Sequence, residues 1–328
     1  MKITDFLAGL LEHRRDAPKT AEGLLAAVET AAGLVDPKVR WVSGYRRKLK
    51  PAVARTLEYA DELIAKIPGP INADPEFWDR DPLLRAIFST PDEILSAFTS
   101  NPHVENLIKT AAAPRLCALL TMTREERSVF GVQLEGDLVK RDVPRTAVNF
   151  VDLRLVAPAA TEAQTREHLR RRALKILCTA AMERILALRT RAQQLGEQRE
   201  LLQIKLKIRR SGRHDLSDLM CGTESCAEEI TRAQDALEEI NREIAAAKAE
   251  LGGPHEYLEH VLRILSHPEE YLWVEPLRLR LTPLGFKVGP KSSEPSAAIE
   301  LCEFKLREGL QRAAVFVCYT IRRTPPQP

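Results

Sequence analysis

A long stretch of the chain, residues 161–251, repeats its apolar residues at alternating spacings of four and three. In the first half these residues are Ala181, Ile185, Leu188, Ala192, Leu195, Leu202 and Leu206, with Arg199 as the one interruption. In the second half they are Cys226, Ile230, Ala233, Leu237, Ile240, Ile244, Ala247 and Leu251. A stripe that recurs every ~3.5 residues stays turned toward a neighbouring helix. The pattern therefore predicts two antiparallel helices that pack as a coiled-coil hairpin.

The residues before Arg115 carry helix signals. Asp-Pro pairs at 36–37, 74–75 and 81–82 each join an N-cap acceptor to a proline that needs no hydrogen bond. Thr90 and Glu93 have the spacing of a capping box. We expect helices near 2–14, 19–34, 37–66, 75–88, 91–99 and 102–112, with a break at 68–73.

Strand signals appear on both sides of the predicted hairpin. Before it they are a short apolar run and segments rich in β-branched and aromatic residues, and after it residues 277–281 alternate with a period of two. The candidate strands are 116–122, 129–134, 147–156, 277–281, 299–306 and 314–321. The charged run 124–127 is predicted to be a turn, and Pro144 is predicted to lie between strands, because a central strand needs its N–H. The simplest topology places all these strands in one antiparallel sheet.

We therefore predict an α+β protein with an N-terminal helical bundle and an antiparallel β-sheet. A long antiparallel coiled-coil helical hairpin is inserted between the strands of that sheet. The predicted domains are a helical bundle in 1–112, a sheet domain in 113–158 plus 271–323, an inserted hairpin in 159–270 and a frayed tail in 324–328.

Composition narrows the class of protein. The chain is 44% hydrophobic and 29% charged, as globular proteins are, and its net charge of +3 does not by itself imply nucleic acid or membrane. It has no apolar run long enough to span a bilayer, and residues 2–14 have amphipathic spacing interrupted by Asp5, so we expect a cytoplasmic protein. Its six cysteines are scattered, which favours reduced, buried thiols.

Charge is distributed unequally along the predicted hairpin. Residues 160–213 contain 14 Lys/Arg and 5 Asp/Glu, a net charge of +9, whereas residues 214–253 contain 3 and 10, a net charge of −7. Two such helices neutralise each other along their flanks. The basic residues that could still bind phosphate are the run 170–172 at the base and a cluster near the tip.

The tip of the hairpin is the candidate partner-binding site. It is longer than a tight helical connection needs and contains apolar residues that a single chain would not readily bury. The predicted partner-binding residues are Arg209, Arg210, Arg213, Leu216, Leu219 and Met220. His214, Cys221 and Cys226 are also present, but the cysteines are five residues apart and Cys226 belongs to the apolar stripe, so we expect no metal.

Other candidate chemistry is weak. His255 and His260 are five residues apart, which places them on different helix faces. No phosphate-binding glycine motif and no nucleophile elbow is present, and we expect no cofactor. Cys302 and Cys318 would face each other in a symmetric terminal hairpin, either as a redox pair or as two buried thiols. Asp142 and Asp152 could belong to an acid–base or cation site.

The leading functional hypothesis is a non-enzymatic protein–protein interaction or scaffold protein that uses the coiled-coil arm. It would bind an unknown protein partner or associate with itself. The first alternative is nucleic-acid binding through the basic tip and residues 170–172. The second is an enzyme whose carboxylate-lined site, with Asp142 and Asp152, lies between the bundle and the sheet.

Overall fold

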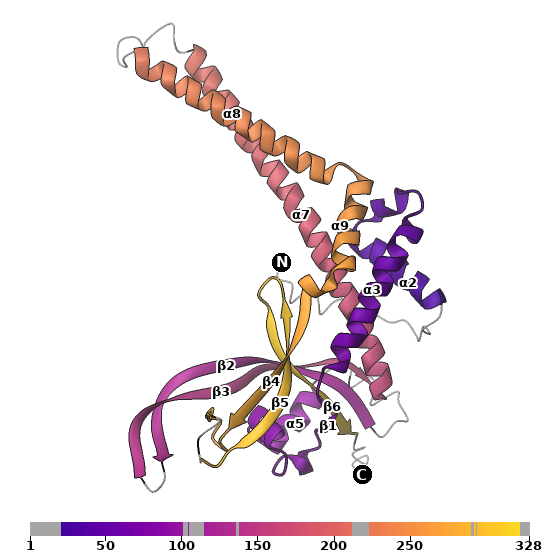
Figure 1. Cartoon of the computed structure of the whole chain (residues 1–328), viewed down its shortest axis with the longest axis vertical. Helices are drawn as coiled ribbons and strands as arrows, with labels where there is room; N and C mark the ends of the chain where they lie inside the picture. The colour runs from indigo at the N-terminus through magenta and orange to yellow at the C-terminus, as the bar shows by residue number, and fades with distance from the viewer. Residues whose placement is uncertain are drawn as a thin grey trace, which may run out of the picture. The chain divides into compact units, whose positions relative to one another are not determined.

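A computed structural model of the chain describes residues 21–100, 104, 115–135, 138–211, 223–289, 292 and 294–321. The protein is α+β, with helices and a mainly antiparallel sheet. It divides into two compact units (Figure 1). Unit 1 comprises residues up to Arg55 together with Cys178–Ser266, and unit 2 comprises Thr56–Leu177 with His267–Pro328. These bounds differ from the predicted domain ranges because helices α3 (Tyr45–Ala65) and α7 (Glu162–Ser211) each contribute to both units.

In the described residues, unit 2 is built on one six-stranded sheet in the order β3-β2-β6-β5-β4, with β1 beside β6. The strands are β1 (Ile71–Asn72), β2 (Arg115–Glu135), β3 (Leu138–Ala159), β4 (Leu272–Leu281), β5 (Ala297–Leu306) and β6 (Gln311–Thr320). Strands from before and after the helical hairpin thus share one sheet, as predicted. The interior of β6 is buried almost without interruption, which is typical of a strand covered on both faces.

Helices cover both faces of this sheet. On one face, α4 (Pro82–Ile87) and α5 (Pro91–Thr99) pack on the alternate residues of the strands, and Phe98 stacks on Tyr319 with ring centroids 4.5 Å apart. On the other, Tyr59 of α3 donates a hydrogen bond to the Leu272 carbonyl, and Thr165 of α7 donates one to the Cys117 carbonyl. The helices α4 and α5, which the sequence assigned to an N-terminal bundle, therefore belong to the core of the sheet.

The strands β2 and β3 are longer than predicted. Residues 124–127 do not form a turn but continue β2, and Pro144 lies inside β3 opposite Phe130. Beyond Met122, where the pairing of β2 with β6 ends, the two strands form a ribbon whose pairing within the described residues is mainly with each other. Charged residues and a proline are tolerated there because Glu126, Arg127 and Pro144 are exposed and the ribbon has an open edge.

A segment predicted to be a break between helices is instead part of the sheet. Residues 71–72 form β1, which pairs with β6 in parallel orientation. Asp74 follows it and does not cap the next turn with its side chain as predicted. Its carboxylate instead accepts hydrogen bonds from the Thr320 backbone N–H at 2.6 Å and from the Thr320 hydroxyl at 2.8 Å. This contact holds the end of β6.

Unit 1 is helical. It contains α2 (Ala21–Val35), the 3₁₀-helix η1 (Pro37–Trp41), the first half of α3, most of α7, α8 (Thr223–Leu251) and α9 (Pro254–Ser266). The single helix predicted over 37–66 is divided at Gly44, whose φ of 69° lies in the left-handed region. Among the described residues, no helix combines the length and the apolarity needed to cross a bilayer.

Candidate functional site

The feature of unit 1 that best resembles a binding site is the pair of long helices. We call residues 178–211 of α7 together with α8 the arm (Figure 1). Ion pairs join Arg184 to Glu250 at 3.5 Å and Arg191 to Glu243 at 3.1 Å. From the first ion pair to the second, the residue number rises by seven in α7 and falls by seven in α8. The two helices are therefore antiparallel.

The predicted apolar seam lies between these helices. Every seam side chain that the structure describes is buried or half-buried. The buried members are Ala181, Ile185, Leu188, Leu195, Leu206, Ile230, Ile244 and Ala247. The hairpin therefore satisfies its own seam within one chain and needs no second chain for that purpose.

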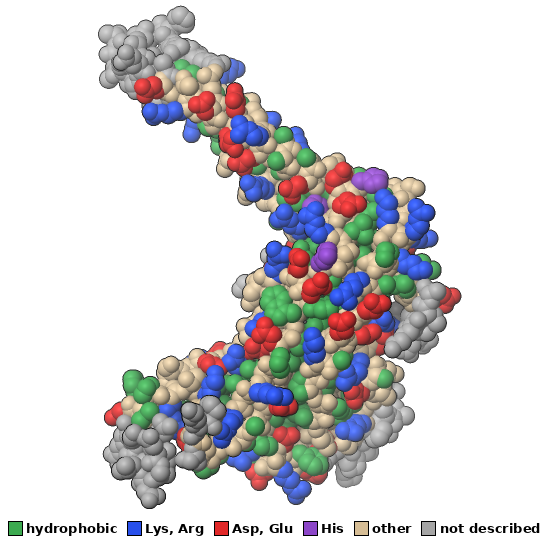
Figure 2. Space-filling model, viewed as in Figure 1, with side chains coloured by type: hydrophobic (Ala, Val, Ile, Leu, Met, Phe, Trp, Pro, Cys, Tyr) green, Lys and Arg blue, Asp and Glu red, His purple; other side chains and the backbone are tan. Residues whose placement is uncertain are grey.

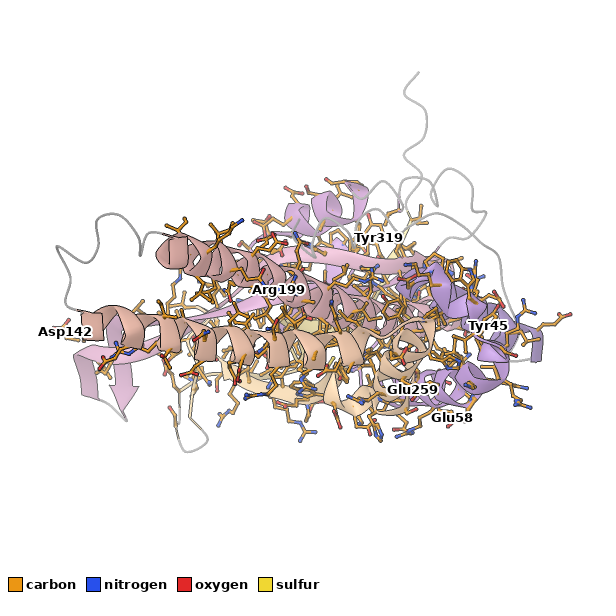
Figure 3. The ribbon with its side chains drawn as sticks, turned by 90° about the horizontal axis from the view of Figure 1, so that it is seen from above. Tyr45, Glu58, Asp142, Arg199, Glu259 and Tyr319 are labelled. Atoms are coloured by element: carbon orange, nitrogen blue, oxygen red, sulfur yellow. The ribbon has the colours of Figure 1, made fainter. Side chains whose placement is uncertain are left out.

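Arg199 is the polar interruption in the seam. It lies on α7 (Figure 3). Its side chain is half-buried, and its Nε atom is buried without a hydrogen-bond partner among the described residues. A polar residue at a seam position reduces stability, and in coiled coils it can restrict the register and the number of helices. Arg199 therefore makes the arm less stable than an apolar residue at the same position would.

A second apolar stripe on α7 was missed in the sequence. Leu201, Ile204 and Ile208 are 58%, 55% and 63% exposed, and we call them the outer stripe. Ile204 lies two residues from each of the seam residues Leu202 and Leu206, a turn of roughly 200° in either direction. The outer stripe therefore faces away from α8. Its spacing of three and then four was the available signal, but the stronger seam rhythm masked it.

Charged residues flank the outer stripe. Glu197, Glu200, Lys205 and Lys207 are all exposed. Figure 2 shows acidic and basic side chains interspersed along the arm. The stripe is thus an apolar surface with polar edges, which is the usual composition of a small protein–protein contact.

The predicted tip site lies mostly outside the described residues. Arg213, Leu216, Leu219 and Met220 belong to the segment 212–222, which the structure does not describe, as do His214 and Cys221. Arg209 and Arg210 belong to α7, but the structure does not describe their side chains. The tip site stays a prediction.

The basic run at the base of the hairpin is used within unit 2. Arg170 Nε lies 3.3 Å from a carboxylate oxygen of Asp61, and Arg171 Nε lies 3.0 Å from one of Glu167. Burial lowers the pKa of Arg172. These contacts favour a structural role for the run over phosphate binding.

The predicted carboxylates do not form one site. Asp142 and Asp152 are ten residues apart on β3, or about 33 Å along an extended strand. Asp152 is held by Arg312 at 2.7 Å and by Arg154 at 2.9 Å. Desolvation opposes its ionisation, but these hydrogen bonds hold its pKa below the usual range. Among the described residues, no group of His, Cys, Asp and Glu could hold a metal ion.

Unit 2 also has an open cavity of about 690 Å³. Its lining combines apolar residues such as Phe88 and Phe150 with Asp79, Arg80 and Asn149. The described residues that line it include no His, Cys or Lys. The polar part of the lining therefore consists of the carboxylates of Asp79 and Glu125 together with arginine, amide and hydroxyl side chains.

The terminal cysteines pair differently from the prediction. Cys302 lies opposite Ala314 and not opposite Cys318. Cys318 lies opposite Cys117 on β2, and both thiols are buried and free. The register differs because the turn of the β5–β6 hairpin is centred on Glu308 and not between Gly309 and Leu310.

No family model, no curated protein and no solved structure matches the chain.

Proposed function

We propose that the protein is a non-enzymatic protein–protein interaction protein that binds its partner through the arm. The observation that carries the proposal is the outer stripe of Leu201, Ile204 and Ile208, three aliphatic side chains that are each more than half exposed. They follow one another at helical spacing on one face of α7. A neighbouring helix or an apolar groove would bury all three together.

The two apolar faces of α7 support this proposal. One face is the seam and is covered by α8, while the outer stripe lies on the opposite face. A helix that is apolar on two opposite sides is typical of one packed between two neighbours, because an exposed apolar stripe gains free energy on leaving water. Helix α8 covers the seam, whereas Leu201, Ile204 and Ile208 are each more than half exposed.

The alternatives have less support. Of the basic residues predicted to bind nucleic acid, Arg170 and Arg171 are paired within unit 2, and the tip cluster lies mostly outside the described residues. An enzyme would need groups brought together, but Asp142 and Asp152 lie far apart on one strand. An exposed aromatic side chain can stack on a nucleic-acid base, and Trp41 is 74% exposed. The nearby Arg40 and Arg46, which would have to bind the phosphates, both pair with Glu29.

The test compares the tagged full-length chain with the variant L201S/I204S/I208S and the control L186S. Leu186 is also an exposed aliphatic residue of α7, but it lies about four helical turns before Leu201. We expect at least one protein, or an untagged copy of the chain, to co-purify about tenfold less with the triple variant, and equally with L186S. Equal recovery with all three chains, quantified by mass spectrometry, would show that the outer stripe binds nothing.

A further inference from the structure

We propose that the outer stripe is covered by the outer stripe of a second copy of this chain, with the two α7 helices antiparallel. This inference rests on the proposed function and names its partner. A two-fold axis near Ile204 places this residue against its twin and Leu201 against Ile208 of the second copy. Each of the three apolar side chains then meets an apolar side chain, as an isologous contact requires.

Charge on one flank of the stripe fits this arrangement. Glu200 and Lys207 are exposed and seven residues apart, so they lie on the same side of the stripe two turns apart. In the antiparallel pairing, Glu200 of one copy lies beside Lys207 of the other. The two-fold axis produces this attraction twice.

Glu197 decides between antiparallel and parallel pairing. It lies one turn before Leu201 and continues the line of the outer stripe, and it is exposed. A parallel pair would place the two Glu197 carboxylates against each other at the contact. In an antiparallel pair, the Glu197 carboxylate of each copy lies instead near the C-terminal end of α7 of the other copy. The antiparallel pairing also brings the two Lys205 side chains near the axis, a repulsion that water screens because both are exposed.

The size of the contact sets its strength. Three partly exposed aliphatic residues per copy bury much less area than a standard stable interface. We therefore expect a weak dimer that dissociates on dilution, and not an obligate one. The same small area makes the dimer sensitive to single charge changes.

The experiment is sedimentation of the full chain over a concentration series. We expect reversible dimerisation of the unaltered protein, and monomers for I204K. The single variants E200K and K207E each set like charges together, so each is expected to weaken the dimer about tenfold or more. The double variant E200K/K207E restores the attraction with the charges exchanged and is expected to restore the dimer.

Two controls make the result specific. L186S is expected to dimerise like the unaltered protein, and circular dichroism of every variant is expected to show unchanged helix content. In a parallel pair, Glu200 would lie beside Lys205, so restoration by E200K/K205E and not by E200K/K207E would overturn the antiparallel arrangement.

Failure of self-pairing is distinguishable from failure of the interaction function. A protein that remains monomeric at all concentrations, or a dimer that survives I204K, overturns the inference. If the triple variant L201S/I204S/I208S nevertheless loses a different co-purifying protein, the proposed function still holds with another partner.

Discussion

Asp36 shows how one side chain can serve two elements of unit 1. Its carboxylate accepts a hydrogen bond from the Lys38 backbone N–H, at 2.9 Å, at the start of η1. It also accepts one from Arg189 of α7 at 2.7 Å. Desolvation opposes its ionisation, but these two hydrogen bonds hold the pKa of Asp36 below its usual range.

The lowered pKa predicts an acid-dependent loss of stability. Because the folded pKa lies below the unfolded value of about 3.9, the contribution of Asp36 is complete above that pH and is lost as pH falls through the folded pKa. Asp36→Asn keeps an N-cap acceptor but removes the charge, so we expect it to lower the free energy of unfolding by about 1–2 kcal/mol at pH 7. Denaturant titrations between pH 7 and pH 2 measure both effects.

The difference between the D36N variant and the unaltered protein should vanish near the acid end of that range. The exposed Asp79 provides the control, since Asp79→Asn is expected to change the free energy of unfolding little at any pH. A pH-independent difference for D36N would mean that the charge of Asp36 does not carry the effect.

The sequence predicted local caps well. Asp81 and Thr90 accept from the backbone N–H groups of Leu83 and Glu93, as the Asp-Pro and capping-box patterns indicate. Asp74 has the same pattern but binds Thr320, which is 246 residues away in the chain. A cap depends on neighbours in sequence, whereas the role of Asp74 depends on where β6 lies.

At the scale of elements, the curved strand β3 depends on three irregularities. Its pairing with β2 shifts register three times, and each shift contains a residue of positive φ: Asp142, Asp152 or Ala157. An extra residue on one strand bends it and increases its twist. Asp is tolerated in this conformation, but Ala is not favoured there.

Ala157 is therefore a strained position that can be improved. Its φ of 53° lies in the left-handed region, where the Cβ atom destabilises the folded state by about 1 kcal/mol and glycine would not. We expect Ala157→Gly to leave the midpoint of thermal unfolding unchanged or to raise it. Ala159→Gly, in the same strand without positive φ, is expected to lower the midpoint. If both variants lowered the midpoint equally, the conformation of Ala157 would carry no strain.

The arm shows which periodicities a sequence reveals. The seam was predicted residue by residue because a repeat sustained over many turns is a strong signal. The outer stripe spans only three residues, and in the sequence they stand beside the seam residues Leu202 and Leu206. Only a measure of exposure separates the two faces of α7.

At the scale of the whole molecule, both units contain buried free cysteines. Cys117, Cys302 and Cys318 lie in unit 2, and Cys178 lies in unit 1, all buried and free. Desolvation raises the pKa of Cys178, Cys302 and Cys318 to about 12, and a hydrogen bond with Cys117 adds to the rise for Cys318. A thiol with so high a pKa is a poor nucleophile near neutral pH.

Because all four of these cysteines are buried, thiol labelling of the native protein at pH 8 is expected to be slow at each of them. Only Cys221 and Cys226, whose side chains the structure does not describe, remain as candidates for fast reaction. The variant C221S/C226S should react only as fast as the protein opens, and denaturant should expose all four remaining thiols together. Fast labelling of that variant in its native state would contradict the burial of the four cysteines.

The sequence by itself determined the α+β class, the helical hairpin between strands and the positions of most caps. These features depend on periodicity and on neighbouring residues, which a sequence records directly. The tertiary structure alone decided that α4 and α5 pack on the sheet, that β1 joins β6, that Cys318 faces Cys117 and that the outer stripe is exposed. Each of these depends on which distant residues meet, and so on the free energy of burial summed over the folded chain.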